Sequence, residues 1–432
     1  MIEQAPKFNQ DPEAVKLMIK IQNSELLKKI QDNYLYWDKV KYQKSDYDSI
    51  DLWSAVKFHR LLNSSKLRFG QYDFSYTLTD FMQRGLHNFD LNFGGTLGSN
   101  IGIAETDQKK FIINSLIEEA ISSSQIEGAS TTRKKAKEMI HKEEKPKSKD
   151  ELMILNNYIT MQEIAEIKND DITPEKILHI HKLITNNTLD NINDEGKFRE
   201  NNDICVYNKL ESETMHTPPN FEEIPKLIDD LCLFFNQPTK NFIHPIVKGC
   251  DIHFMLAWIH PFADGNGRTS RALFYWFMLK SGYWMTEYLS ISRIIKGSKN
   301  KYEKAFLYTE SDNNDLSYFI TYHINTLEKA ISELKKYINH KQKEVSQASK
   351  FLQIPLVNDR MAQILKIIYD DADRVLSIKE VESRFHVSKG TARSDLKTLV
   401  ELGFLQIINV NRIKQNFIKS ANFDQKMNSY KF

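Results

Sequence analysis

The residues best suited to chemistry lie together in one segment, HPFADGNGRTSR, at positions 260–271. His260 titrates near neutrality and could take a proton from an incoming hydroxyl group. Asp264 offers a hard carboxylate oxygen of the kind that Mg²⁺ binds beside a phosphate. Arg268 and Arg271 are three residues apart, so on a helix they point to the same side and offer forked donors to an anion. These residue types together predict phosphoryl transfer without a covalent nucleophile.

The glycines of the segment predict an anion-binding turn. Gly265 and Gly267 flank Asn266 and remove side chains, so backbone N–H groups can approach phosphate oxygens. A helix that begins here adds the positive end of its dipole. The chain has no GxxxxGK(S/T) motif, which excludes a P-loop. A lone His-Pro or GNG is more often an ordinary turn, but the joint occurrence of all these elements favours a site.

Two predicted helices must position this segment. The stretch Pro245–Ile259 has apolar residues at helical spacing, and Pro261 ends it because proline disfavours helical geometry in the residue before it. The stretch Asn266–Ser281 is again helical and ends at Gly282. The chemistry therefore lies on a tight loop that opens onto a helix N-terminus.

The segment resembles the complete signature of the Fic family, HPFx(D/E)GNGRxxR, and the resemblance covers roughly residues 106–330. In that family the histidine activates a Tyr, Thr or Ser hydroxyl of a target protein, and the acidic residue holds Mg²⁺. The activated hydroxyl attacks the α-phosphate of ATP, and pyrophosphate leaves. The resemblance therefore implies a nucleotidyltransferase that moves AMP onto protein, with ATP as substrate and Mg²⁺ as cofactor.

The family roles carry over residue by residue. His260 becomes the general base, Asp264 the magnesium ligand, and Phe262 an anchor of the loop in the core. The resemblance assigns the binding of the nucleotide phosphates to the remaining matched positions, which are Gly265, Asn266, Gly267, Arg268 and Arg271. The phosphorylating Doc branch departs at the glycines and the first arginine, so their presence favours nucleotide transfer.

Two further places resemble the family outside the loop. The segment Gly196–Arg199 and the short predicted hairpin after it resemble the flap over the active site, where Ile204 and Val206 would dock the target by strand addition. An ordinary surface hairpin is the alternative. Tyr302 matches a tyrosine beside the nucleoside, with a core aromatic as its alternative, and His253 is interpreted as a packed histidine.

The segment SSSQIEG resembles the inhibitory signature of the family, (S/T)xxxE(G/N), with Ser123 and Glu127 at its defining positions. It ends a predicted helix over about 108–128, N-terminal to the active loop. The Glu127 carboxylate could pair with Arg271, whose other duty would be the γ-phosphate of ATP. We therefore expect autoinhibition within the chain. Whether the same glutamate also positions a water for AMP removal stays open.

The whole chain is expected to be cytosolic. Its 432 residues carry a formal charge of +2, so nucleic acid or membrane could be a partner only through a local patch. Its three cysteines, at 205, 232 and 250, are too few and scattered for a disulfide framework. The first residues lack the apolar core of a secretion signal. The apolar run Leu273–Leu279 is far shorter than the ~20 residues that span a bilayer.

The predicted fold class is mainly α, with a Fic core and a short β-hairpin flap. The predicted domains are a helical N-terminal region (1–107), a Fic domain with its inhibitory helix (108–330), a helical linker (331–357) and a winged helix-turn-helix (358–432).

The predicted winged helix could contact DNA or another protein. Its third helix, capped by Ser388, would present three basic residues, and its wing would add two, which together are Lys389, Arg393, Lys397, Lys414 and Lys419. The positive charge of this segment is modest for duplex binding.

Three functions compete at this point. The first is a protein adenylyltransferase whose partners are target proteins and the chain itself; a homodimer and DNA are further partners that the sequence allows. The second is a DNA-binding transcriptional regulator in which the Fic core senses nucleotide. The third is an inert scaffold, which the complete loop argues against. The sequence leaves open the target, the acceptor residue type and donors other than ATP.

Overall fold

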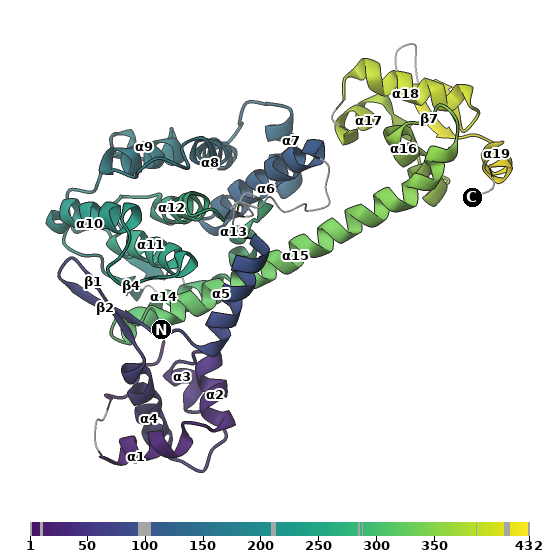
Figure 1. Ribbon diagram of the computed structural model, residues 1–432. Helices are drawn as coiled ribbons and strands as arrows, with labels where there is room; N and C mark the ends of the chain where they lie inside the picture. The colour runs from purple at the N-terminus through teal and green to yellow at the C-terminus, as the bar shows by residue number, and fades with distance from the viewer. Residues whose placement is uncertain are drawn as a thin grey trace. The chain divides into compact units, whose positions relative to one another are not determined.

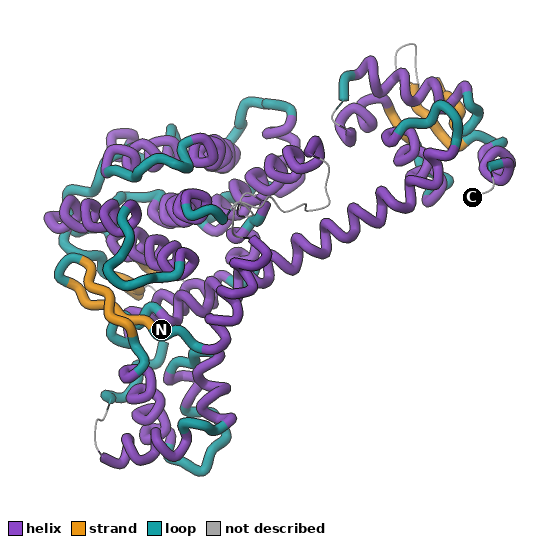
Figure 2. The backbone as a smooth tube through the Cα atoms, viewed as in Figure 1, coloured by secondary structure: helices purple, strands orange, loops and turns teal. Residues whose placement is uncertain are grey.

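The computed structural model describes residues 2–8, 12–93, 105–208, 213–283, 286, 288–385, 387–409 and 415–430. The described chain is mainly helical, with short strands among the helices (Figure 2), which confirms the predicted fold class. Its contacts divide it into two compact units that meet in the sequence at Leu334 and Lys335. The division falls within the long helix α15 (Ser317–Ser349). Among the described residues, no helix combines the length and apolar character that crossing a membrane requires.

The first unit begins with a group of helices and one hairpin (Figure 1). Its elements are α1 (Pro12–Ile21), α2 (Glu25–Asp32), α3 (Trp37–Val40), α4 (Ser49–Leu62), β1 (Ser65–Phe69), β2 (Tyr72–Tyr76) and α5 (Asp80–Phe93). The hairpin is antiparallel, with Ser65 opposite Tyr76.

A buried arginine joins this N-terminal part to α15. The guanidinium of Arg60 on α4 donates to Gln31 Oε1 at 3.0 Å, to the Leu35 carbonyl at 2.9 Å and to Tyr318 Oη at 2.7 Å. Because a buried charge needs such partners, this contact fixes α4 against α15. The region predicted as a separate N-terminal domain thus lies in one compact unit with the helical core.

The helical core follows in the same unit. Its helices are α6 (Glu105–Ile126), α7 (Arg133–His141), α8 (Lys149–Glu166), α9 (Pro174–Thr185), α10 (Ile224–Asn236), α11 (Pro245–Ile259), α12 (Asn266–Lys280), α13 (Ile291–Lys296) and α14 (Lys299–Ser311). Its other elements are η1 (Ile192–Asp194), β3 (Val206–Asn208), β4 (Glu213–His216) and η2 (Phe221–Glu223).

The helices α11 and α12 form the centre of this core. Nearly all residues of both helices are buried, as is typical of helices that are surrounded by other helices. Helices α6, α8 and α9 pack against α12, and α10 packs against α11. The predicted bounds of α11 are confirmed, and those of α12 are confirmed to within one residue at its end.

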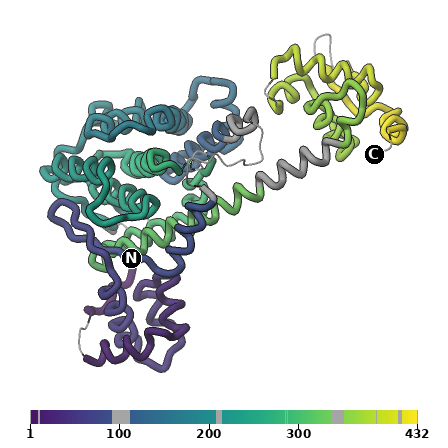
Figure 3. The backbone as a smooth tube through the Cα atoms, in the orientation of Figure 1, coloured from purple at the N-terminus to yellow at the C-terminus, as the bar shows by residue number. Residues whose placement is uncertain are grey.

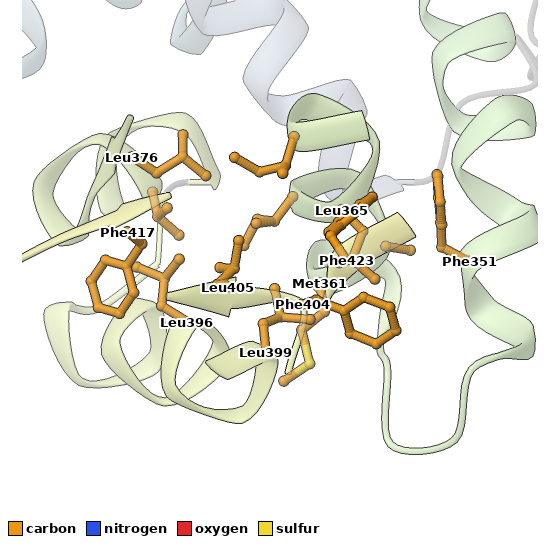
Figure 4. Packing of buried hydrophobic residues seen from close by; sticks show 14 of the residues in the cluster. Phe351, Met361, Leu365, Leu376, Leu396, Leu399, Phe404, Leu405, Phe417 and Phe423 are labelled. Carbon is orange, nitrogen blue, oxygen red and sulfur yellow. The ribbon is translucent and has the colours of Figure 1, made fainter. Parts of the chain in front are cut away.

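The second unit continues from α15 through η4 (Lys350–Gln353), α16 (Asp359–Asp370), β5 (Leu376–Ser377), α17 (Ile378–Phe385), α18 (Lys389–Glu401), β6 (Leu405–Asn409), β7 (Gln415–Lys419) and α19 (Phe423–Ser429). Its antiparallel sheet has the order β5-β7-β6. Apolar side chains from the helices and the sheet share one core (Figure 4), which includes Leu365, Leu376, Leu396, Leu405 and Phe417. Lys414 of the predicted wing lies outside the described residues.

Candidate active site

His260 lies at the C-terminal end of α11 in the left-handed region, with φ 49°. Its Nδ1 is 3.1 Å from the Ala257 carbonyl oxygen. A carbonyl can only accept a hydrogen bond, so Nδ1 carries the proton and Nε2 keeps a free lone pair. Burial lowers the pKa of the imidazole to about 4, although the Ala257 contact opposes this shift. The ring is therefore neutral near pH 7 and ready to accept a proton at Nε2.

Arg199 holds the backbone of this loop in place. Its Nε donates to the His260 carbonyl at 3.0 Å, and its backbone N–H donates to the Pro261 carbonyl at 2.8 Å. Its Nη2 also reaches the Pro219 carbonyl, at 2.5 Å. The segment Gly196–Arg199, which resembled part of the flap, therefore supports the loop after His260 directly.

Asn266 and His181 shape the rest of the loop. The Asn266 side chain accepts from the Phe262 N–H at 2.9 Å and donates to the Phe262 carbonyl at 2.8 Å. Both ends of this amide bind the loop, so Asn266 has its backbone N–H and the second N–H of Nδ2 left to offer an anion. His181 on α9 lies parallel to the Phe262 ring, with centroids 3.7 Å apart, and donates from Nε2 to the Asp264 carbonyl at 2.8 Å.

His181 was not singled out from the sequence. Its Nδ1 accepts from the Gly196 N–H at 3.1 Å, so one buried imidazole joins α9, the Gly196 segment and the loop after His260. Burial lowers its pKa to about 4, which keeps the ring neutral with one donor and one acceptor.

The predicted anion-binding turn lies at the N-terminus of α12. Gly265 precedes the helix in the left-handed conformation, with φ 85°. A Cβ atom at Gly267 would clash with the carboxylate oxygen Oε1 of Glu127. A carboxylate therefore already lies against the first turn of the helix, where a phosphate would also be favoured.

Arg268 presents a free donor inside the protein. Only 1% of the residue is exposed. Its Nη1 donates to the Ile184 carbonyl at 3.1 Å, and its Nη2 is 3.8 Å from Asp264 Oδ2. Its Nε is buried without a hydrogen-bond partner. Because such donors are rarely left unpaired, this atom is a candidate contact for a bound ligand.

Arg271 is held by the end of α6. Its Nε donates to Ser123 Oγ at 2.9 Å, and its Nη2 donates to the Ser123 carbonyl at 3.0 Å and to Glu127 Oε1 at 2.8 Å. Burial alone would raise the pKa of the Glu127 carboxyl, but the charge and hydrogen bond of Arg271 outweigh it and hold this pKa below its ordinary value. Figure 3 shows the α6 segment beside α12 and α13, which follow much later in the chain.

Asp264 has an exposed side chain, with 67% of it accessible. A single exposed carboxylate beside a phosphate cradle suits Mg²⁺, which usually takes one or two carboxylates and completes its shell with phosphate oxygens and water. No group of three or more metal-binding side chains occurs among the described residues.

The hairpin of β3 and β4, which is the predicted flap, precedes His260 in the sequence and is anchored by His216. Its strand β3 begins at Val206, so Ile204 precedes the strand, and Val206 is opposite His216 on β4. His216 Nε2 is 2.7 Å from the Trp258 carbonyl oxygen, and its Nδ1 is 2.7 Å from Glu310 Oε2. His216 thereby connects the flap to α11 and α14, a role that its sequence context did not reveal.

Tyr302 lies on α14 and is buried, with its hydroxyl 2.9 Å from His253 Nε2. His253 is also buried, in agreement with its interpretation as a packed histidine. The structure thus brings the predicted base, cradle, arginines, inhibitory residues and Tyr302 into one region of the first unit.

Comparison with known proteins agrees with this geometry. Residues 171–278 match the model of the Fic/DOC family. A protein adenylyltransferase Fic of Aedes aegypti is 34% identical over 116 residues, which are 27% of this chain and 21% of that protein. The chain therefore matches about a fifth of the length of this curated relative. The central part of the chain carries a Fic domain.

Solved structures show the same fold. A Fic family protein from Desulfovibrio desulfuricans G20 superposes with a TM-score of 0.53 at 18% identity, over 79% of this chain and 95% of that one. Fic-1 (residues 134–508) from C. elegans superposes with a TM-score of 0.51 at 17% identity, over 76% of this chain and 88% of that one.

Proposed function

We propose that this chain is a protein adenylyltransferase that moves AMP from ATP onto a Tyr, Thr or Ser hydroxyl of a target protein, including itself. The observation that carries the proposal is the neutral imidazole of His260, whose free Nε2 lies on the same loop as the anion cradle and the unpartnered donor of Arg268. The adenylyltransferase names of the relatives support an enzyme over a nucleotide-sensing regulator.

In the proposed reaction the acceptor hydroxyl gives its proton to His260 Nε2 while its oxygen attacks the α-phosphorus. The bond from that phosphorus to the oxygen bridging to the β-phosphate breaks, and pyrophosphate leaves. The first N–H groups of α12 and the guanidinium of Arg268 hold the phosphates. Mg²⁺, held by Asp264 and phosphate oxygens, would offset the negative charge on the leaving pyrophosphate.

We also propose that Glu127 inhibits this reaction. Its carboxylate uses Arg271 Nη2 and lies over Gly267, so a triphosphate competes with it for both the guanidinium and the cradle. With Glu127 in place, ATP would bind with its phosphates out of line for attack. Glu127 directly follows α6, which precedes the Fic core in the same chain, and this order supports inhibition in cis.

The test is transfer of label from α-³²P-ATP with Mg²⁺ onto protein. Glu127→Gly should raise self-modification at least tenfold, because the cradle and Arg271 become free, and His260→Ala in that background should abolish it. Glu143→Gly is a matched control, since Glu143 is exposed and has a positive φ of 52° that glycine tolerates. His179→Ala is the control for His260→Ala, because it removes an exposed imidazole from α9. Equal labelling in all four variants and the parent would overturn the proposal.

For the second unit we infer a winged helix that contacts DNA. The exposed residues Lys389, Arg393 and Lys397 recur every four positions on α18, whereas Asp395 turns inward to Arg360 at 2.8 Å. Ser388 caps the helix by accepting from the Thr391 N–H. Such a basic face is what a recognition helix offers to phosphates and base edges.

Duplex binding should weaken as salt rises, and Arg393→Glu should reduce it at least tenfold at 100 mM salt. Fluorescence anisotropy with a labelled mixed-sequence duplex measures this. Glu401→Lys at the other end of α18 is a control of opposite sign that should strengthen or preserve binding. Absence of any salt-dependent binding would leave protein docking as the role of this unit.

A further inference from the structure

The last turn of α6 is a helix end whose backbone carbonyls all have hydrogen-bond partners. An α-helix leaves its last four carbonyl groups without partners inside the helix, so these groups must be bound by something else. Two of them are bound locally, by the turn that follows the helix. The Ser124 carbonyl accepts from the Ala129 N–H at 3.1 Å, and the Gln125 carbonyl accepts from the Gly128 N–H at 3.2 Å.

Cations from two later helices bind the other two carbonyls. Arg271 Nη2 on α12 donates to the Ser123 carbonyl at 3.0 Å. Lys299 Nζ, from the first residue of α14, donates to the Ile126 carbonyl at 2.8 Å. The Ile126 carbonyl belongs to the peptide group that joins Ile126 to Glu127. Lys299 therefore holds the backbone directly before the proposed inhibitory carboxylate.

A second lysine binds the same helix end. Lys296 Nζ, at the end of α13, donates to Gln125 Oε1 at 2.6 Å, and Gln125 Nε2 donates to the Thr131 carbonyl at 2.8 Å. Positive charges near the C-terminus of a helix also interact favourably with the negative end of its dipole. The end of α6 is thus bound by residues of α13 and α14 as well as by Arg271.

The turn that carries Lys299 is itself anchored, while its side chain remains accessible. Ser298 Oγ lies 2.9 Å from the Tyr322 hydroxyl on α15. The Lys299 side chain is 50% exposed, and Glu303 Oε1 lies 3.9 Å from Nζ, beyond hydrogen-bonding distance. A substitution at Lys299 can therefore remove the contact to α6 without opening a cavity in the core.

We infer that Lys299 is a positioning residue for Glu127. It holds the end of α6 where the Glu127 carboxylate reaches Arg271 Nη2, at 2.8 Å. Loss of the ammonium group frees the last peptide group of α6 and shifts the balance toward the state in which Glu127 leaves Arg271. The inference rests on the proposed function, and it adds a determinant of basal activity that lies outside both the signature loop and the inhibitory signature.

The main test is the rate of self-labelling from α-³²P-ATP with Mg²⁺ in the full chain. Lys299→Met removes the charge and the donor but keeps a long side chain, so this rate should rise about threefold over the parent. Lys299→Arg keeps a cationic donor and should stay within about 1.5-fold of the parent. Lys301→Met is the matched control, because Lys301 is exposed on the same helix, and it should label at the parent rate.

A double variant separates positioning from a general effect on the enzyme. In the Glu127→Gly background no carboxylate remains to be positioned, so adding Lys299→Met should change the rate by less than about 1.5-fold. A rise in both backgrounds, a fall in either, or no rise over the parent overturns the inference. A fall would mean that Lys299 serves the transfer reaction itself.

Hydrogen exchange measured by mass spectrometry tests the positioning without any activity. Peptides that cover the end of α6 should exchange faster in Lys299→Met than in the parent, while Lys299→Arg and Lys301→Met should match the parent. If the Glu127→Gly chain transfers no AMP, the proposed function is contradicted, and exchange alone decides the inference. Equal exchange in Lys299→Met and the parent overturns it.

Discussion

At the scale of single residues, three histidines of the first unit are kept neutral by burial. His260, His181 and His323 are each held in one tautomer by a backbone partner, and burial lowers the pKa of each to about 4. A base is useful near pH 7 only when unprotonated, and a loop is fixed only when each ring nitrogen has a defined role. Burial keeps the rings neutral, and the backbone partners set the role of each ring nitrogen.

This burial predicts an acid sensitivity of the fold. The imidazoles have an ordinary pKa of 6.5, so between pH 6.5 and about 4 the unfolded chain binds protons that the folded chain excludes. The stability that these rings contribute is complete above pH 6.5 and is lost as the pH falls toward 4. Urea unfolding at a series of pH values should show this decline.

One variant isolates the contribution of His181. In His181→Gln the free energy of unfolding should fall less steeply between pH 6.5 and 5, by up to one proton, whatever its value at pH 7. His179→Gln, which replaces an exposed imidazole on the same helix, should keep the slope of the parent. An unchanged slope in His181→Gln would contradict the assigned cause.

The sequence predicts some of these residues and not others for a physical reason. His260, Asp264 and Arg271 lie in one contiguous pattern, so their chemistry can be inferred from spacing. His181 and Arg199 act on carbonyl groups of the loop from 83 and 61 residues away. A backbone carbonyl leaves no mark on the sequence, so these two contacts appear only once the chain is folded.

At the scale of elements, helix ends were predictable where a local rule determines them. Pro245 is the first residue of α11 and follows its N-cap, His244, and the left-handed His260 before Pro261 ends the helix. The flap was less predictable, since its register shifts between Val206 and Tyr207 and its first strand begins two residues after Ile204. Short strands at an exposed edge have few contacts to fix their ends.

The position of α6 against the core depends on a buried acid that the sequence did not reveal. Glu119 accepts from Tyr275 Oη at 2.7 Å, from the Ser292 N–H at 2.9 Å and from Ser290 Oγ at 3.2 Å. It lies on α6, about two turns before Glu127, which directly follows the last residue of this helix. Glu119 therefore fixes the helix that leads to the proposed inhibitory carboxylate.

Replacement of this carboxylate should destabilise the protein. Glu119→Ala leaves the buried N–H and hydroxyl donors of Ser292 without the carboxylate that accepts from both, which should lower the free energy of unfolding by about 3 kcal/mol. Glu138→Ala, at an exposed helical position, should change it by less than about 0.5 kcal/mol. Urea denaturation measures both. A Glu119→Ala chain as stable as Glu138→Ala would show that water or rearrangement satisfies these donors.

At the scale of the whole molecule, each of the two compact units of the chain has its own core. The first unit combines α11 and α12 with the N-terminal helices through Arg60, a link that no local pattern predicts because its partners lie at Gln31 and Tyr318. The second unit has its own apolar core, which includes Leu396 and Phe417. The sequence predicts the end of the Fic domain and the start of a linker at residue 331, and the two compact units divide between residues 334 and 335. Helix α15 continues through this boundary without a break in composition.

Two independent cores predict two unfolding transitions in calorimetry. Leu231→Ala on α10 and Leu396→Ala on α18 each remove a fully buried leucine side chain, which costs about 2–5 kcal/mol in a packed core. Leu231→Ala should lower the midpoint of one transition and leave the other within about 1 °C, and Leu396→Ala should do the converse. The pair is matched in residue type and burial, so a difference in response reports the unit and not the substitution. If either variant shifts both transitions together, or if the parent unfolds in one transition with equal calorimetric and van't Hoff enthalpies, the two units fold as one cooperative body.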